Sequence, residues 1–135
     1  MDWNIMNYHF SKTCSLTFEK AIEAVTEELK TEGFGVLTQI DVAETFKRKL
    51  GVDFPRYRIL GACNPTFAYQ ALQAEDKIGT MLPCNVIVQE RDGGKVEVSA
   101  VDPVASMMAI ENSSLAAIAG QVRAKLQRVI ANLPA

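Results

Sequence analysis

The stretch CNVIVQERDGGKVEVSAV, from Cys84 to Val101, decides the fold. Two runs rich in β-branched residues flank the turn-forming sequence RDGG, a pattern that is typical of a β-hairpin. Alternation within the second run places Val96, Val98 and Ala100 on one side of the strand, so we expect this side to be buried. The hairpin therefore makes at least part of the sheet antiparallel.

Segments on both sides of the hairpin alternate between strand and helix patterns. Met6, Tyr8 and Phe10 repeat at every second position, which predicts a first strand with His9 on its other side. The remaining elements are predicted from three- and four-residue periodicity, caps and turn residues. They are a helix between Ser15 and Gly33, a strand over 33–40, a helix between Asp41 and Gly51, a strand over Tyr57–Cys63, a helix capped by Asn64 that runs from Pro65 to Ala74, and a helix over Ser114–Leu133.

Strands and helices interleave along the chain, but the hairpin prevents an all-parallel sheet. The sequence therefore predicts an α+β fold with a mixed, partly antiparallel sheet, helices packed on one face and a long C-terminal helix. A length of 135 residues, 48% of them hydrophobic, is typical of one compact domain, here residues 1–135.

The composition argues against several classes of function. The net charge is −2, whereas nucleic-acid binders usually present a positive surface to phosphates. The N-terminal MDWNIMNYHF lacks the basic and apolar regions of a secretory signal, and no apolar run is long enough to cross a bilayer. Three cysteines, an odd number, favour free thiols in a reducing compartment. We therefore expect a cytoplasmic protein with neither nucleic acid nor a membrane as its partner.

The long C-terminal helix carries a second stripe of small residues. Ala116, Gly120 and Ala124 follow one another at a spacing of four, which allows another backbone to approach closely. The stripe has two explanations, packing within the chain or contact with a second copy. Because twofold homodimers are the commonest soluble oligomers, we expect a homodimer.

Five segments of the chain form an ordered set: EGFGVLTQIDV, ILGACNP, LPCNVIV, DGGKVEVSAVDP and the long terminal helix. Together they resemble the family known as domain of unknown function 302, and the likeness covers nearly the whole chain. The resemblance implies a small, dimeric α+β domain. It supplies no catalytic residues to carry over, because the family is uncharacterised.

Two cysteines occur in similar contexts, ACNP at Cys63 and LPCNV at Cys84. Cys63 directly precedes a predicted helix N-terminus, where free N–H groups stabilise a thiolate. If the two strands are antiparallel neighbours, both thiols lie at the same end of the sheet. A right-handed crossover would instead make the strands parallel and separate the thiols by roughly 20 Å.

The antiparallel arrangement predicts a small pocket. Its candidate ligand-binding residues are Cys63, Asn64, Pro83, Cys84 and Asn85. A soft metal ion such as Cu(I) is a weaker candidate, with Cys63 and Cys84 as thiolate ligands. The thioether ligands available to such an ion are Met81, Met107 and Met108.

Three functions are compatible with these residues. The leading hypothesis is a cytoplasmic, homodimeric binding or accessory module that accepts a small ligand or a soft metal. The second is a thiol-based enzyme or sulfur carrier with Cys63 as nucleophile and Cys84 as resolving thiol. The third is a structural interaction domain whose buried cysteines are inert. The chain has no GxGxxG, Walker, HExxH or GxSxG motif, so neither a cofactor nor a catalytic residue is assigned.

Overall fold

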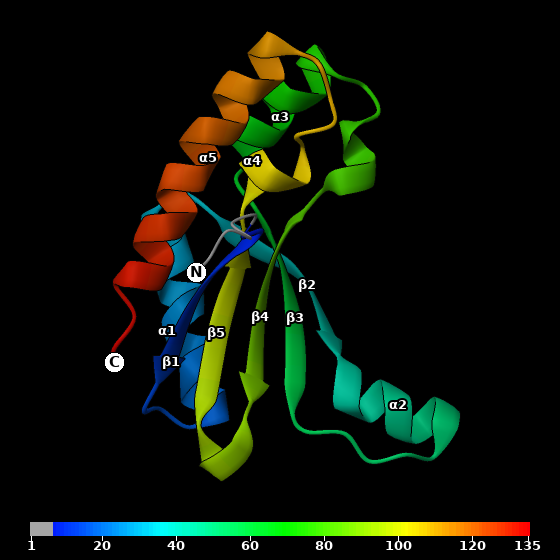
Figure 1. Ribbon diagram of the computed structural model, residues 1–135, viewed down its shortest axis with the longest axis vertical. Helices are drawn as coiled ribbons and strands as arrows, with labels where there is room; N and C mark the ends of the chain where they lie inside the picture. The colour runs from blue at the N-terminus through cyan, green and yellow to red at the C-terminus, as the bar shows by residue number, and fades with distance from the viewer. Residues whose placement is uncertain (1–6) are drawn as a thin grey trace.

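The computed structural model describes residues 7–135, which form a five-stranded sheet with helices packed against it (Figure 1). The strands lie in the order β1-β5-β4-β3-β2, and every pairing is antiparallel. The predicted α+β class is confirmed, and the sheet, expected to be partly antiparallel, is antiparallel throughout. The elements are β1 (His9–Cys14), α1 (Phe18–Thr31), β2 (Gly35–Asp41), α2 (Val42–Leu50), β3 (Tyr57–Cys63), α3 (Pro65–Ala74), η1 (Ile78–Met81), β4 (Cys84–Glu90), η2 (Asp92–Gly94), β5 (Val96–Val101), α4 (Pro103–Ser106) and α5 (Ser113–Ala131).

The helices are distributed unevenly around the sheet. α1 and α5 lie against one face, and α3 and α4 pack beside α5 at one end of the molecule (Figure 1). α2 projects from the edge of the sheet and buries none of its residues. Among the described residues, no helix packs over the centre of the opposite face.

The core lies between the sheet and the two long helices. Val96, Val98 and Ala100 are buried, as the alternation in β5 predicts, and Val86 and Val88 of β4 lie opposite Ala100 and Val98. Full burial of one such side chain contributes about 1.5–3 kcal/mol relative to its exposure to water. The helices contribute Phe18, Ala21, Val25 and Leu29 from α1, and Val122, Leu126, Val129 and Ile130 from α5.

Most predicted helix ends are confirmed. The Asp41 side chain accepts a hydrogen bond from the backbone N–H of Glu44 at 2.9 Å, and Gly51 ends α2 in the left-handed region with φ of 67°. Asn64 caps α3, and Pro65 occupies the first helical position. The lack of an N–H on proline costs nothing there, since that group has no partner inside the helix.

Two N-terminal predictions change. Thr17 rather than Ser15 caps α1, and this start places Phe18, the first helical residue, in the core. The predicted first strand began at Met6, which lies outside the described residues. Tyr8, expected on the apolar side of that strand, is exposed and precedes β1.

The long C-terminal helix is confirmed as α5, with Asn112 as its cap. A Cβ atom added at Gly120 would meet nothing within 4 Å, so this part of the small-residue stripe does not pack within the described chain. Contact of the stripe with a second copy stays a prediction. None of the helices in residues 7–135 is both long enough and apolar enough to span a bilayer.

Candidate functional site

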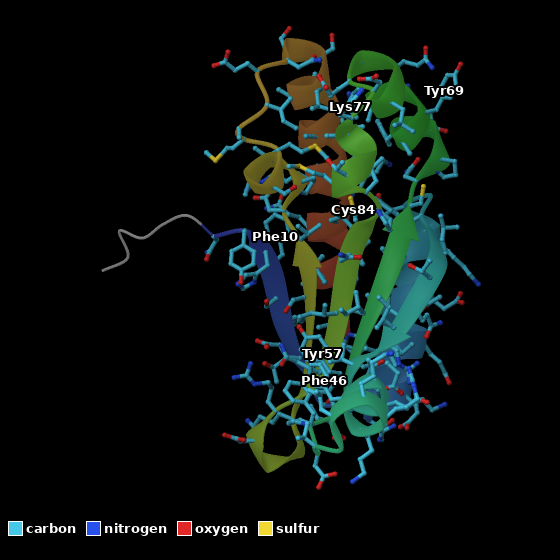
Figure 2. All side chains as sticks on the ribbon, turned by 90° about the vertical axis from the view of Figure 1, so that its right-hand side faces the viewer. Phe10, Phe46, Tyr57, Tyr69, Lys77 and Cys84 are labelled. Carbon is cyan, nitrogen blue, oxygen red and sulfur yellow. The ribbon has the colours of Figure 1, made fainter. Side chains whose placement is uncertain are left out.

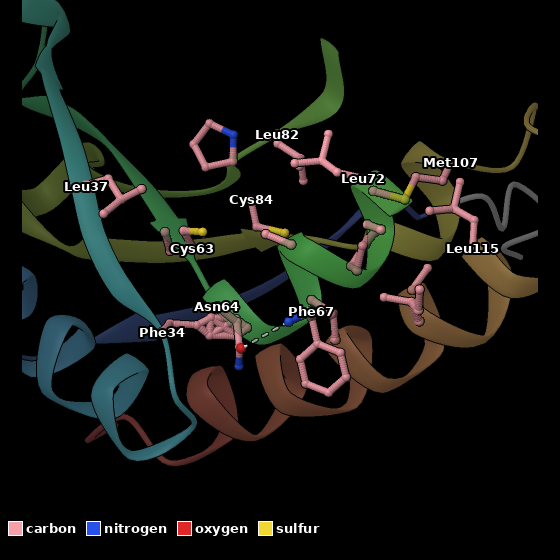
Figure 3. Close-up of a pocket in the computed structure, with 18 of the residues that line it drawn as sticks. Phe34, Leu37, Cys63, Asn64, Phe67, Leu72, Leu82, Cys84, Met107 and Leu115 are labelled. Carbon is pink, nitrogen blue, oxygen red and sulfur yellow. Dashed lines mark hydrogen bonds between the residues drawn. The ribbon is translucent and has the colours of Figure 1, made fainter. Parts of the chain in front are cut away.

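A cavity of about 320 Å³ lies at the end of the sheet where α3, α4 and α5 meet (Figure 3). Several elements contribute to its wall, and nearly all of the exposed wall is apolar. The lining residues are Phe34, Leu37, Thr38, Ala62, Cys63, Asn64, Phe67, Ala68, Ala71, Leu72, Leu82, Pro83, Cys84, Pro103, Met107, Leu115, Ile118, Ala119 and Val122.

The two cysteines meet at this cavity. β3 and β4 are antiparallel neighbours, with Ala62 opposite Cys84, so Cys63 and Cys84 lie at the same end of the sheet. Both line the cavity, and Figure 3 shows them next to each other. The parallel crossover considered from the sequence does not occur.

The environment of Cys84 keeps its thiol protonated. Burial raises the pKa of Cys84 to about 11, and the neighbouring Cys63 contributes a smaller increase. A thiolate is the nucleophilic and metal-binding form of cysteine. At neutral pH Cys84 is therefore a small apolar group in the cavity wall, which disfavours its predicted role as a resolving thiol.

Asn64 lines the cavity, and its amide group makes two hydrogen bonds within the chain. Its Oδ1 accepts the N–H of Phe67 at 3.5 Å, and its Nδ2 donates to the backbone oxygen of Glu32 at 3.2 Å. These bonds attach the start of α3 to the loop that follows α1. Asn64 thus shapes the site, and its amide keeps one N–H and one oxygen lone pair beyond these two bonds.

Of the remaining two candidate ligand-binding residues, Pro83 lines the cavity and Asn85 does not. Pro83, which follows a cis peptide bond, lies over Gly61, where an added Cβ atom would collide with the Pro83 ring and the Thr38 hydroxyl. Glycine is therefore required for this close approach beside the cavity. Asn85 is exposed and does not line the cavity, because alternation along β4 turns it to the face opposite that of Cys84.

Few of the proposed metal ligands come together. Met107 lines the cavity with the two cysteines, whereas Met81 and Met108 are exposed and do not line it. The described residues contain no group of three or more His, Cys, Asp or Glu side chains placed to hold a metal ion.

Charged groups outside the cavity hold its walls together. Asp102 caps α4 and accepts a hydrogen bond from Arg123 of α5 at 3.0 Å. Glu32 accepts two from Arg128 of α5, at 3.0 and 3.1 Å, and these hydrogen bonds lower the pKa of the Glu32 carboxyl. α4 and the end of α1 are thereby fixed to α5.

Several lining residues of the cavity carry no signal in the sequence. Ala62, Ala68, Ala71 and Ala119 provide small side chains on three different elements. Alanine is common in helices, so its occurrence in α3 and α5 carried no signal of a cavity. The space depends on which alanines face one another after folding.

The chain has clear relatives. The family model described as "Domain of unknown function DUF302" matches residues 10–133. The crystal structure of an uncharacterized conserved DUF302 protein from Bacillus stearothermophilus has a TM-score of 0.85 and 30% sequence identity, over 92% of this chain and 96% of that chain. No curated protein matches this chain.

Proposed function

This chain belongs to the DUF302 family, and we propose that it is a cytoplasmic, homodimeric module that binds a small, uncharged, largely apolar ligand in the cavity at the end of its sheet. The observation that carries the proposal is the cavity itself. Its volume of about 320 Å³ lies within the range of small-molecule sites, which are concave and mainly apolar.

The chemistry of the wall supports an uncharged ligand. Among the residues that the structure describes, no Lys, Arg, Asp, Glu or His side chain lines the cavity. A buried charge without a partner is strongly unfavourable, so a charged group of a ligand would have to remain at the opening. Transfer of an alkyl chain or an aromatic ring out of water is favourable, and it needs no hydrogen-bond partner in the cavity.

The cavity supports a small ligand better than a soft metal ion. A metal ion would need Cys84 to lose its proton, and burial opposes this by raising the pKa of Cys84 to about 11. The hydrocarbon groups of Leu72, Leu115 and Ile118 in the wall also offer no ligand atoms. Metal analysis of the purified protein distinguishes a small-ligand site from a soft-metal site, because a metal site should retain stoichiometric metal.

Calorimetric titration with 1-octanol and with indole tests the proposal. We expect at least one probe to bind with a negative heat-capacity change, because apolar surface leaves water. The bound probe should also raise the melting temperature, since it binds only the folded state. Absence of both effects for both probes would contradict the proposed function.

Two variants on α5 show whether binding occurs in the cavity. Ala119→Leu fills space at the buried wall, whereas Ala117→Leu adds the same atoms at an exposed position of the same helix. The first variant should bind the probe at least about tenfold more weakly, and the second should bind like the wild type. Equal affinity of both variants would place the probe elsewhere.

A further inference from the structure

The face of the sheet that α1 and α5 leave uncovered has a central row of unusual composition. Its central row, read across the five strands, consists of Ile40, Ile59, Ile87, Ser99 and Ser11. An antiparallel sheet with one solvated face normally carries polar residues there. Three adjacent isoleucines depart from this pattern, and neither Ile59 nor Ile87 belongs to a core cluster of the described chain.

The isoleucine row continues into an aromatic cluster at one end of the sheet. Phe46 of α2 meets Phe54 edge-on, with 5.1 Å between the ring centroids, and Phe54 lies 6.1 Å from Tyr57 of β3. Figure 2 shows Phe46 and Tyr57 at the same end of the molecule, and Phe54 is 43% exposed. α2 buries none of its nine residues, although short helices depend on tertiary packing for stability.

The polar half of the central row already has hydrogen-bond partners. Ser99 is only 7% exposed, and its hydroxyl lies 2.7 Å from that of Ser11. The Ser11 hydroxyl in turn lies 2.8 Å from Nδ1 of His9. A second protein surface can bury polar groups that are paired in this way with little loss of free energy, because the desolvation penalty falls mainly on unpaired groups.

The size of this face suits a stable protein contact. Five strands about 4.8 Å apart and about 20 Å long have a footprint of roughly 500 Å². A nine-residue helix such as α2 adds roughly 130 Å². Accessible area exceeds a flat footprint, so the total approaches the ~800 Å² per partner of a standard interface.

We propose that this face binds the same face of a second copy of the chain. The three isoleucines lie on β2, β3 and β4, next to the aromatic cluster, so a twofold axis near β3 and β4 stacks the isoleucine rows of two copies on each other. α2, none of whose residues is buried within the described chain, then gains a further packing partner. The inference rests on the homodimer of the proposed function and not on the ligand of the cavity.

Light scattering after size-exclusion chromatography tests this interface. The wild type should be a dimer. Ile40→Glu, at a position that is 50% exposed, should weaken the dimer by about a hundredfold or more, because it buries an unpaired charge. Ile87→Glu is a second variant at the centre of the face. Unchanged circular dichroism of the Ile40→Glu monomer would show that it remains folded.

Gly120→Glu on α5 is the matched control, because it places the same charge on the small-residue stripe, which is the alternative contact with a second copy that the sequence predicts. This variant should remain a dimer. A monomeric wild type would overturn both the interface and the homodimer. Dissociation of Gly120→Glu, with both isoleucine variants still dimeric, would overturn the interface alone. Ile40→Glu should still bind the apolar probe, so a failure of ligand binding is distinguishable from a failure of this inference.

Discussion

On the face of the sheet that α1 and α5 cover, one region is filled and the other is hollow. In the filled region, Leu60 and Val88 of the sheet meet Val25 and Leu126 of the helices, and all four side chains are fully buried. In the hollow region, beside α3, the wall carries several alanines, and a cavity of about 320 Å³ remains. Both regions are apolar.

The difference shows that apolar composition alone does not determine packing. Interiors are normally close-packed, and an apolar void lacks the dispersion contacts that neighbouring atoms would provide. Dispersion contacts therefore stabilise the hollow region less than the filled region. The ligand that we propose for this cavity would restore those contacts.

The largest effect is expected from truncating leucines of α5 in the two regions. Leu126→Ala, in the filled region, should lower the free energy of unfolding by about 2–5 kcal/mol. Leu115→Ala, in the cavity wall, should cost clearly less, because part of the Leu115 surface already lacks neighbours. Urea denaturation of both variants provides the measurement. A cost at Leu115 equal to that at Leu126 would show that the two regions are packed alike.

The next largest effect on stability is expected from replacing an alanine by leucine in each region. Ala21→Leu in α1 inserts atoms into the filled region and should cost about 1–3 kcal/mol. Ala119→Leu inserts the same atoms beside the cavity and should change stability by less than about 1 kcal/mol. Melting curves of the two variants, recorded in the same buffer, make the comparison. Equal destabilisation by the two substitutions would argue that the cavity closes in solution.

Thiol labelling examines the wall of the hollow region without a substitution. The pKa of Cys84 rises from 9.0 to about 11, so its thiolate fraction at neutral pH should be about a hundredfold lower than that of an ordinary thiol. Iodoacetamide labelling of Cys84, followed by peptide mass spectrometry, should be slow and should accelerate about tenfold per pH unit below pH 11. The guanidinium-unfolded chain is the control. Equal labelling rates in the folded and unfolded chains would contradict this environment.

The smallest effect concerns the ion pair that joins α1 to α5. Glu32→Gln should lower the melting temperature by a few degrees at neutral pH, because the carboxylate no longer pairs with Arg128. The Arg128 hydrogen bonds lower the pKa of Glu32, so its stabilisation is present above the ordinary pKa of 4.5 and disappears as the pH falls through the lowered one. Wild type and variant should therefore converge in acid. A constant difference between pH 7 and acid would contradict the ion-pair explanation.

The elements of the fold were largely predictable from local signals. The hairpin at Cys84–Val101, the capped start of α3 at Asn64 and Pro65, and the end of α2 at Gly51 each depend on neighbouring residues, and each is confirmed. The prediction of Ser15 as the cap of α1 was wrong, because Ser15 and Thr17 are both residue types that cap helices well. The packing of Phe18 into the core, a tertiary effect, favours Thr17.

The site was predictable only in part. The paired contexts of Cys63 and Cys84 pointed to this end of the sheet, but their proximity depended on the direction of β4 relative to β3, which local sequence does not determine. The contributions of Ala71 and Ala119 depend on how α3 and α5 pack on each other. The row of Ile40, Ile59 and Ile87 was likewise hidden, because cross-strand register places these residues side by side.

A crystal structure of the protein under xenon pressure would show whether the cavity is open and apolar, because xenon binds in apolar cavities that contain no ordered water. We expect xenon in the cavity between Cys84 and Ala119, with the surrounding side chains in place. A cavity without xenon, filled by ordered water or by the side chains of Leu72 and Met107, would contradict an open apolar binding site.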